Sequence, residues 1–298
     1  MSTERRNPRS VDIDLFPTER ILRIINAEDA LVANAVGTAV PNIAKTVDLS
    51  VQVIRGGGRI LYVGAGTSGR IGALDAAECP STFSAPPEWF EAVIAGGSKA
   101  LVHALEGAED DPAKAATDLK ARKVCSKDLI IGIAASGKTP YTIAALEYGK
   151  SKNARTVALV AAPDSPLSKV AEIVIETLVG PEIVTGSTRM KAGTAQKLVL
   201  NMISTATMIR LGMTYSNWMI NVTMTNSKLR TRGVHMLCEI LGVSLDEAQK
   251  LTEQSGGRLK VAVVMGATGC SRKDAEARLE AGAGNLRKIL GHLGSGRE

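Results

Sequence analysis

Two short turns rich in Gly, Ser and Thr carry the clearest chemistry in this sequence. The first is Gly64-Ala-Gly-Thr-Ser-Gly69, and the second is Ala135-Ser-Gly-Lys-Thr-Pro140. Each turn follows an apolar run and opens a helical pattern, so hydroxyls and free backbone N–H groups gather at a helix N-terminus. The helix dipole favours an anion there, which indicates a phosphate site. The candidate phosphate ligands in these two turns are Thr67, Ser68, Gly69, Ser136 and Thr139.

The first turn also satisfies G-x-G-x-x-G, the fingerprint of dinucleotide-binding folds. Such a site also needs an acid for the ribose, about 20 residues further on, at the end of the second strand. The second apolar run, Glu91–Ala95, leads instead into Gly96-Gly-Ser98, with no Asp or Glu. A dehydrogenase is therefore disfavoured, and the two turns together favour a sugar phosphate.

A third segment, Thr185–Lys197, again places hydroxyls ahead of a helix and adds cations. One interpretation is an ordinary helix start with solvated charges. The other is that one cation reaches the phosphate or the sugar. On the second interpretation the candidates are Ser187, Thr188 and Lys191.

The elements that must position these residues alternate along the chain. Short runs rich in β-branched residues alternate with helical patterns, which predicts an α/β fold with a parallel sheet sandwiched between helices. Such sheets bind ligands at the carboxyl ends of their strands. Helices are expected from Thr18, and from Glu28 to Arg55 with a break at Pro41. The expected strands are 59–64, 91–95, 129–134, 156–161 and 172–179, and further helices are expected at 190–211 and 216–229.

The last 65 residues show no strand pattern and contain an internal repeat, in which Gly242–Ala248 matches Gly269–Ala275. In each copy a Ser precedes an acid by three residues, the arrangement of a helix cap. We expect a small all-helical subdomain that serves packing or dimer contact. The expected division is 1–50 for an N-terminal tail and helices, 51–230 for the sugar-phosphate-binding domain, and 231–298 for the helical subdomain.

Composition excludes several other classes of protein. The formal charge of +6 is spread among acids, with no basic run interleaved with aromatics, so nucleic acid is not an expected partner. The four Cys and three His residues lack ligand spacing, so no metal site is expected. The polar N-terminus lacks the apolar core of a signal peptide, and no apolar stretch is long enough to span a membrane. We therefore expect a cytoplasmic protein.

Four longer segments of the sequence resemble those of a known family. The segments are LYVGAGTSGRIGALDAAECP (61–80), EGAEDD (106–111), GIAASGKTPY (132–141) and VTGSTRMKAGTAQKLVLNMIST (184–205). They resemble the N-acetylmuramic acid 6-phosphate etherases over most of residues 18–230, and the two turns resemble the sugar isomerase (SIS) fold. One departure is Asn221, where the resemblance implies Asp.

The resemblance implies a lyase that removes the lactyl ether of N-acetylmuramic acid 6-phosphate without a cofactor. In the open-chain sugar the aldehyde acidifies the proton at C2, a base removes it, and the ether oxygen at C3 leaves as D-lactate. Water then adds at C3. Glu78 and Glu109 are the carboxylates that the resemblance implies, with Glu78 in acid/base work at the ether and C2, and Glu109 as a supporting base. The two roles are open to exchange, and Glu106 is the rival of Glu109.

Two alternatives share the fold. A non-catalytic phosphosugar-binding regulator would use the same turns without needing Glu78 and Glu109. A phosphosugar isomerase would use an acid/base pair for a different reaction. The SIS resemblance also implies a homodimer, because such folds commonly place part of the site at a subunit interface.

Overall fold

The computed structural model describes residues 4–222, 224 and 227–291, apart from the side chain of residue 228. Within it the chain divides into two compact units. One comprises Met1–Glu78 and Pro87–Thr207, and the other comprises Cys79–Pro86 and Met208–Glu298. The three-part division expected at residues 50 and 230 stays a prediction, since compact units need not be separately folding domains.

The first unit contains a five-stranded parallel sheet with strand order β2-β1-β3-β4-β5. All five expected strands are present, with their ends shifted by up to three residues. Their β-branched and Leu residues are buried on both faces, apart from the half-buried Ile173 and Val174 at one edge of the sheet, as a sheet covered by helices requires. The strands are β1 (Ile60–Gly64), β2 (Phe90–Ile94), β3 (Leu129–Ile133), β4 (Arg155–Val160) and β5 (Ile173–Glu176).

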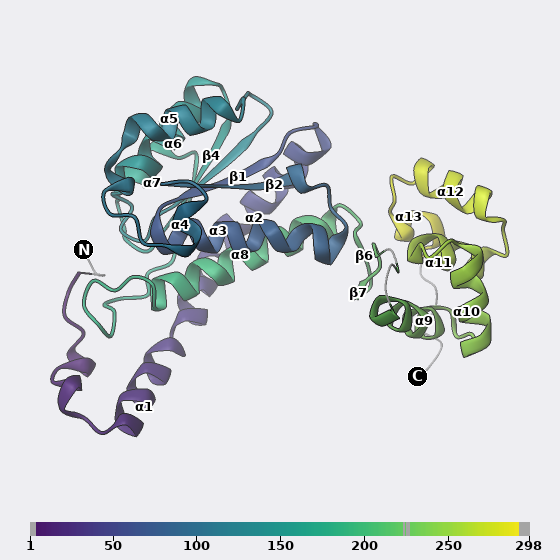
Figure 1. The fold of residues 1–298 in the computed structure, drawn as a ribbon, viewed down its shortest axis with the longest axis horizontal. Helices are drawn as coiled ribbons and strands as arrows, with labels where there is room; N and C mark the ends of the chain where they lie inside the picture. The colour runs from purple at the N-terminus through teal and green to yellow at the C-terminus, as the bar shows by residue number, and fades with distance from the viewer. Residues whose placement is uncertain (1–3, 223, 225–226, 292–298) are drawn as a thin grey trace. The chain divides into compact units, whose positions relative to one another are not determined.

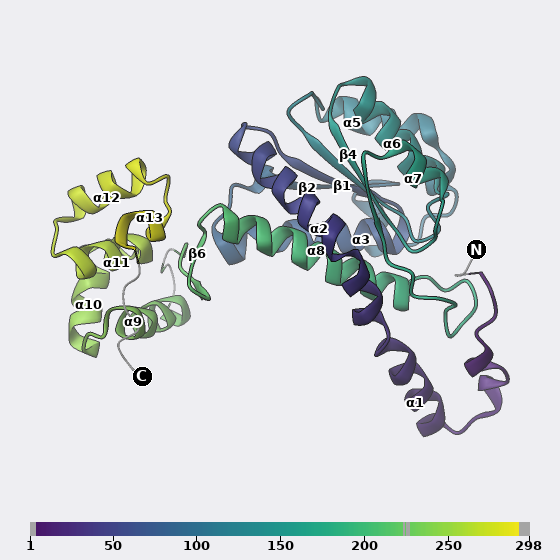
Figure 2. The ribbon, with the colours of Figure 1, turned by 180° about the vertical axis from the view of Figure 1, so that it is seen from behind.

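Helices cover both faces of this sheet (Figures 1 and 2). On one face lie α5 (Pro112–Ala121), α6 (Pro140–Ser151) and α7 (Pro166–Val170). On the other lie α2 (Val32–Arg55), α3 (Gly66–Phe83) and α8 (Lys191–Arg210). Leu61 and Val63 face the first layer, while the intervening Tyr62 faces α3, as strand alternation requires. The predicted SIS-type sandwich of sheet and helices is confirmed.

The N-terminal helices differ in two respects from expectation: the second helix begins at Val32 rather than at Glu28, and it has no break. α1 (Thr18–Asp29) begins at the predicted residue, but α2 runs unbroken through Pro41, so the predicted break is wrong. Proline removes one N–H and crowds the carbonyl four residues earlier. That residue is Gly37, which is exposed, so water can satisfy its carbonyl. Eleven buried residues along α2 hold the helix together across the proline.

The second unit contains a hairpin where a helix was expected. Residues 216–229 were predicted to be helical, but β6 (Thr214–Tyr215) pairs antiparallel with β7 (Trp218–Met219). Ser216 adopts a φ of 50°, a left-handed conformation that suits a two-residue hairpin turn and ends a helix. Nearby, the Asn221 side-chain N–H donates to the Phe83 carbonyl at 2.6 Å, a bond that an ionised Asp could not donate.

Short helices make up the rest of the second unit, as predicted. Ser244 forms a capping box with Glu247, and Ser271 caps its helix with Asp274, so both halves of the repeat start as the spacing predicted. The helices are α9 (Ser227–Leu241), α10 (Leu245–Gln254), α11 (Leu259–Thr268), α12 (Arg272–Ala281) and α13 (Leu286–Leu290). Among the residues described in either unit, no helix is long and apolar enough to cross a bilayer.

Candidate functional site

The first turn lies at the carboxyl end of β1, in the middle of the sheet. Gly64 ends the strand opposite Ile133 of β3, and α3 begins two residues later. The Gly69 N–H donates to the Ala65 carbonyl at 3.2 Å. A Cβ on Gly69 would come within 2.7 Å of the Gly64 carbonyl oxygen, so only glycine allows the turn to fold this tightly. Thr67 and Ser68 are half-buried in the first turn of the helix.

The second turn lies beside the first, because β3 is the neighbour of β1. Its Gly137 has a φ of 63°, and a Cβ there would overlap the Ser165 hydroxyl. The Ser136 hydroxyl accepts from the Lys138 N–H at 3.3 Å, and Thr139 precedes the first residue of α6. The sheet thus brings the two predicted phosphate turns to one edge, with both helix N-termini directed there.

The third segment also reaches this edge. A Cβ on Gly193, near the start of α8, would lie 3.4 Å from the Thr67 methyl group. The Thr188 carbonyl accepts from the Gly193 N–H at 3.0 Å, which ties the segment to that same first turn of α8. Ser187 and Thr188 are half-buried. The start of α8, and the segment tied to it, therefore lie beside the first turn.

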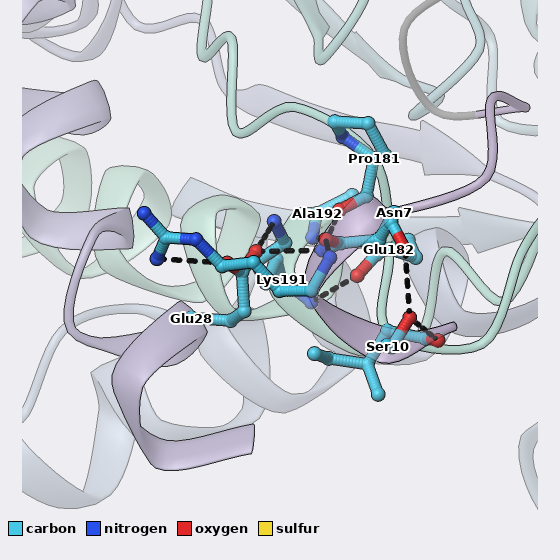
Figure 3. A network of polar contacts seen from close by, with 9 residues as sticks. Asn7, Ser10, Glu28, Pro181, Glu182, Lys191 and Ala192 are labelled. Carbon is cyan, nitrogen blue, oxygen red and sulfur yellow. Dashed lines mark hydrogen bonds and ion pairs between the residues drawn. The ribbon is translucent and has the colours of Figure 1, made fainter. Parts of the chain in front are cut away.

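The N-terminus of α8, however, already holds an anion from the protein itself. The Glu182 carboxylate is fully buried and accepts from the N–H groups of Lys191 and Ala192, each at 3.0 Å (Figure 3). These are donors that a phosphate would otherwise use. At the start of α6, by contrast, the N-cap residue Thr139 makes no side-chain cap hydrogen bond.

Lys191 lies in the same buried network. Its ammonium group donates to Glu28 at 2.6 Å, and Asn7 donates to the same Glu28 oxygen at 2.8 Å (Figure 3). Burial opposes ionisation of Glu28, but these donors outweigh it and lower the pKa of the carboxyl group. Asn7 also donates to the Pro181 carbonyl, and Ser10 to the Ile183 carbonyl. The N-terminal segment is thereby fastened to the stretch of chain that leads into the third segment.

Glu109 lies beside the first turn. It belongs to the 3₁₀ turn η4 (Ala108–Asp110) and lines a pocket of about 170 Å³. Ala65 and Gly66 of the first turn line the same pocket. Glu106, the rival carboxylate, lines it too, and both glutamates are exposed. A ligand held at the first turn would therefore find a carboxylate within the same pocket.

Glu78 lies elsewhere on the same chain. It is an exposed residue of α3, twelve residues after Gly66, which corresponds to about 18 Å of helix rise. It does not line the pocket that holds Glu109. The structure therefore brings Glu109, but not Glu78, to the first turn of its own chain.

Two further residues, Arg70 in this pocket and Asp75 further along α3, were not predicted from the sequence. Arg70 lines the pocket with Glu109. Its place could have been noticed in the sequence, because a cation in the first turn of a helix is unfavourable beside the positive end of the helix dipole. Asp75, three residues before Glu78, is buried and accepts from Tyr62 at 3.0 Å and from Ser204 at 3.3 Å. It joins β1, α3 and α8. A lone Asp inside an apolar helix face gave only a weak signal.

No group of three or more His, Cys, Asp or Glu side chains in the described ranges is arranged to hold a metal ion. The chemical resources of the site are hydroxyls, backbone N–H groups, carboxylates and one guanidinium group. This set suits phosphate binding combined with proton transfer.

Comparison with known proteins agrees with this chemistry. Residues 42–150 match the glucokinase regulatory protein N-terminal SIS domain, and residues 111–206 match the SIS domain. A solved structure of a protein from E. coli CFT073 aligns with a TM-score of 0.50 at 18% identity, covering 68% of this chain and 97% of that chain. At this identity the likeness shows the fold alone.

Two relatives extend the match along nearly the whole chain. An N-acetylmuramic acid 6-phosphate etherase of Jannaschia sp. (strain CCS1) is 52% identical over 261 residues, covering 88% of this chain and 83% of the relative. One of Brucella anthropi is 48% identical over 288 residues, covering 97% and 94%. At these identities and coverages, the chain belongs to the N-acetylmuramic acid 6-phosphate etherase family.

Proposed function

We propose that this protein is a lyase that cleaves the D-lactyl ether of N-acetylmuramic acid 6-phosphate, giving N-acetylglucosamine 6-phosphate and D-lactate in the cytoplasm. The observation that carries the proposal is the pocket in which Glu109 lies beside the first phosphate turn. The identity of 48–52% to named etherases, over 88–97% of this chain, supports the choice of substrate.

The reaction needs only proton transfers between bound groups. A carboxylate removes the proton at C2 of the open-chain sugar, where the C1 aldehyde stabilises the carbanion. The electron pair forms a C2–C3 double bond, and the C3–O bond breaks as a carboxylic acid protonates the departing lactate. Water then adds its oxygen to C3 while C2 regains a proton. Atoms and charge balance, and the acid and base end in their starting states.

The phosphate would bind at the two open helix starts, which lie side by side at the edge of the sheet. Ser187 and Thr188 are proposed to add hydroxyl contacts, because Gly193, which lies near the Thr188 carbonyl, also lies near the Thr67 methyl group. Lys191 contributes indirectly, through the buried pair that fixes the start of α8. The proposed phosphate and sugar ligands are Thr67, Ser68, Gly69, Ser136, Thr139, Ser187 and Thr188.

The two glutamates require a further proposal. A hexose phosphate is shorter than the rise of about 18 Å between Gly66 and Glu78 along α3, which argues against one bound substrate touching both Glu109 and Glu78 of the same chain. We propose a homodimer in which the second copy supplies the second carboxylate. The helices at the N-terminus support this, because they expose large apolar side chains at Leu15, Leu22, Leu31 and Val40.

The direct test is release of D-lactate from N-acetylmuramic acid 6-phosphate, assayed without added metal or nucleotide. Glu109→Gln and Glu78→Gln should each abolish turnover while still binding the phosphosugar, because an amide keeps the shape but transfers no proton. Binding without lactate release from the native protein would favour the regulator. Normal turnover by either variant would remove that residue from the mechanism.

The dimer has its own test. The two inactive variants, Glu78→Gln and Glu109→Gln, are unfolded together, refolded as a mixture and assayed. If each site takes one glutamate from each chain, mixed dimers contain one intact site and activity returns. If both glutamates act within a single chain, no mixture regains activity.

A further inference from the structure

Arg70 makes two hydrogen bonds at the pocket that holds Glu109. Its Nε donates to the Leu101 carbonyl at 3.2 Å, and its Nη2 donates to the His103 carbonyl at 2.8 Å. Both carbonyls belong to the end of the short helix α4 (Lys99–Val102) and its cap. Carbonyl groups at a helix C-terminus lack partners within the helix and attract a cation. The guanidinium group therefore bridges α3 to the far end of α4.

The chain beyond this anchor leads directly to Glu109. Residues 101–107 are all exposed, so burial does little to hold them in one conformation. The segment then enters the 3₁₀ turn Ala108–Asp110, where the Asp110 N–H donates to the Gly107 carbonyl at 3.1 Å. Arg70 joins this exposed stretch to the helix that starts at the first phosphate turn. The anchor, the turn and Glu109 all line one pocket of about 170 Å³.

We propose that Arg70 is a positioning residue for this reaction: by bridging the Leu101 and His103 carbonyls it keeps the Glu109 carboxylate beside the first turn. The inference rests on the proposed function. The planar guanidinium group supplies two donors in a fixed fork, which the single ammonium group of Lys cannot reproduce. Arg70 acts through Glu109 and is assigned no contact with the substrate.

The test compares Arg70→Lys with a matched control, Arg155→Lys. Arg155 also uses a two-donor fork, here to Glu172, but it lies at the start of β4, the opposite end of the sheet from the phosphate turns. We expect kcat for lactate release to fall about a hundredfold in Arg70→Lys, the effect of a misplacement of about 1 Å, with KM little changed. Arg155→Lys should keep the native kcat. Arg70→Ala should regain part of its activity when guanidinium is added.

A second readout does not depend on the reaction. Amide hydrogen exchange in the ligand-free protein should be faster across residues 101–110 in Arg70→Lys, and unchanged there in Arg155→Lys. A native kcat with native exchange rates would overturn the inference. A raised KM with native kcat would also overturn it, because that result indicates contact with the substrate. If the native protein releases no lactate, the proposed function fails, while the exchange measurement still decides whether Arg70 anchors the segment.

Discussion

The ammonium group of Lys191 lies 2.6 Å from the carboxylate of Glu28, and both side chains are almost completely buried. The pair joins the end of α1 to the first residue of α8, across 163 residues of chain. Lys191 was predicted from the sequence to reach the substrate. Its position suggests that its effect on the substrate passes through the start of α8.

Replacing Lys191 by Met should destabilise the fold by about 3–5 kcal/mol, because Glu28 would lose its buried cation and keep only Asn7 and the largely exposed Arg9 as partners. Denaturant unfolding measures this loss, and Lys45→Met, the same change on an exposed face of α2, should stay within about 0.5 kcal/mol of native. The lowered pKa of Glu28 adds a pH signature: its contribution is present above the ordinary value of 4.5 and is lost as pH falls through the lowered pKa. Native stability with a strongly raised KM would instead make Lys191 a direct ligand.

Gly137→Ala should weaken phosphosugar binding at least tenfold, because the added methyl group would overlap the Ser165 hydroxyl and displace the second turn. A tenfold change corresponds to about 1.4 kcal/mol. Gly180→Ala is the matched control, since Gly180 also has a positive φ, of 72°, but a Cβ there meets nothing within 4 Å. Titration of each variant with N-acetylglucosamine 6-phosphate measures the affinity. Equal losses in both variants would attribute the effect to backbone strain alone.

Asp75→Asn should leave the protein as stable as the native form at pH 7, or more stable. Burial raises the pKa of Asp75, and Lys197, Tyr62 and Ser204 offset that only in part. A carboxyl group with a raised pKa stabilises the fold below its ordinary value of 3.8, and this stability is lost as pH rises through the raised pKa. Asn avoids that loss, whereas Asp75→Leu should cost about 1–3 kcal/mol, because Tyr62 and Ser204 would each lose the carboxylate as an acceptor. Unfolding curves at pH 4 and pH 7 separate the two variants. A large loss in Asp75→Asn at pH 7 would show that the charge itself is needed.

Lys260 should make the second unit more stable as pH rises from about 8 to 10.5. Burial lowers the pKa of this ammonium group to about 8, from an ordinary 10.5. Between those values the unfolded chain holds the proton and the folded chain does not, so the free energy of unfolding increases with pH. The full effect is on the order of 3 kcal/mol. Lys260 donates to the Gly212 and Gly284 carbonyls. Lys260→Met should abolish the slope, and a slope that persists in this variant would assign it to other groups.

The strands could be predicted from the sequence because each is a short, nearly continuous apolar run, and their order brought the two turns together as expected. Local patterns failed where distant contacts decide the structure. α2 continues through Pro41 because its buried face packs on the sheet, an effect that no local pattern shows. The hairpin at 214–219 was missed because its apolar residues also fit a helix.

The candidate site shows the same difference between features set by neighbouring residues and features set by distant contacts. Hydroxyls at helix starts are encoded within a few residues, so the two turns could be predicted from the sequence as candidate phosphate sites. The occupation of the α8 start by Glu182, and the pairing of Lys191 with a residue in α1, depend on the tertiary fold. Glu109 was chosen through resemblance, and its place beside the first turn emerged only from the structure.

The packing of α2 against the last strand has a consequence for synthesis on the ribosome. Asn42 of α2 donates to the Val174 carbonyl of β5, 132 residues later in the chain. At a translation rate of about 5–20 residues per second, β5 is synthesised roughly 10 seconds after α2. During that interval the residues of α2 that contact β5 lack this partner. Slower translation would lengthen this interval, and chaperones that meet chains at the ribosome exit would be needed most at that stage.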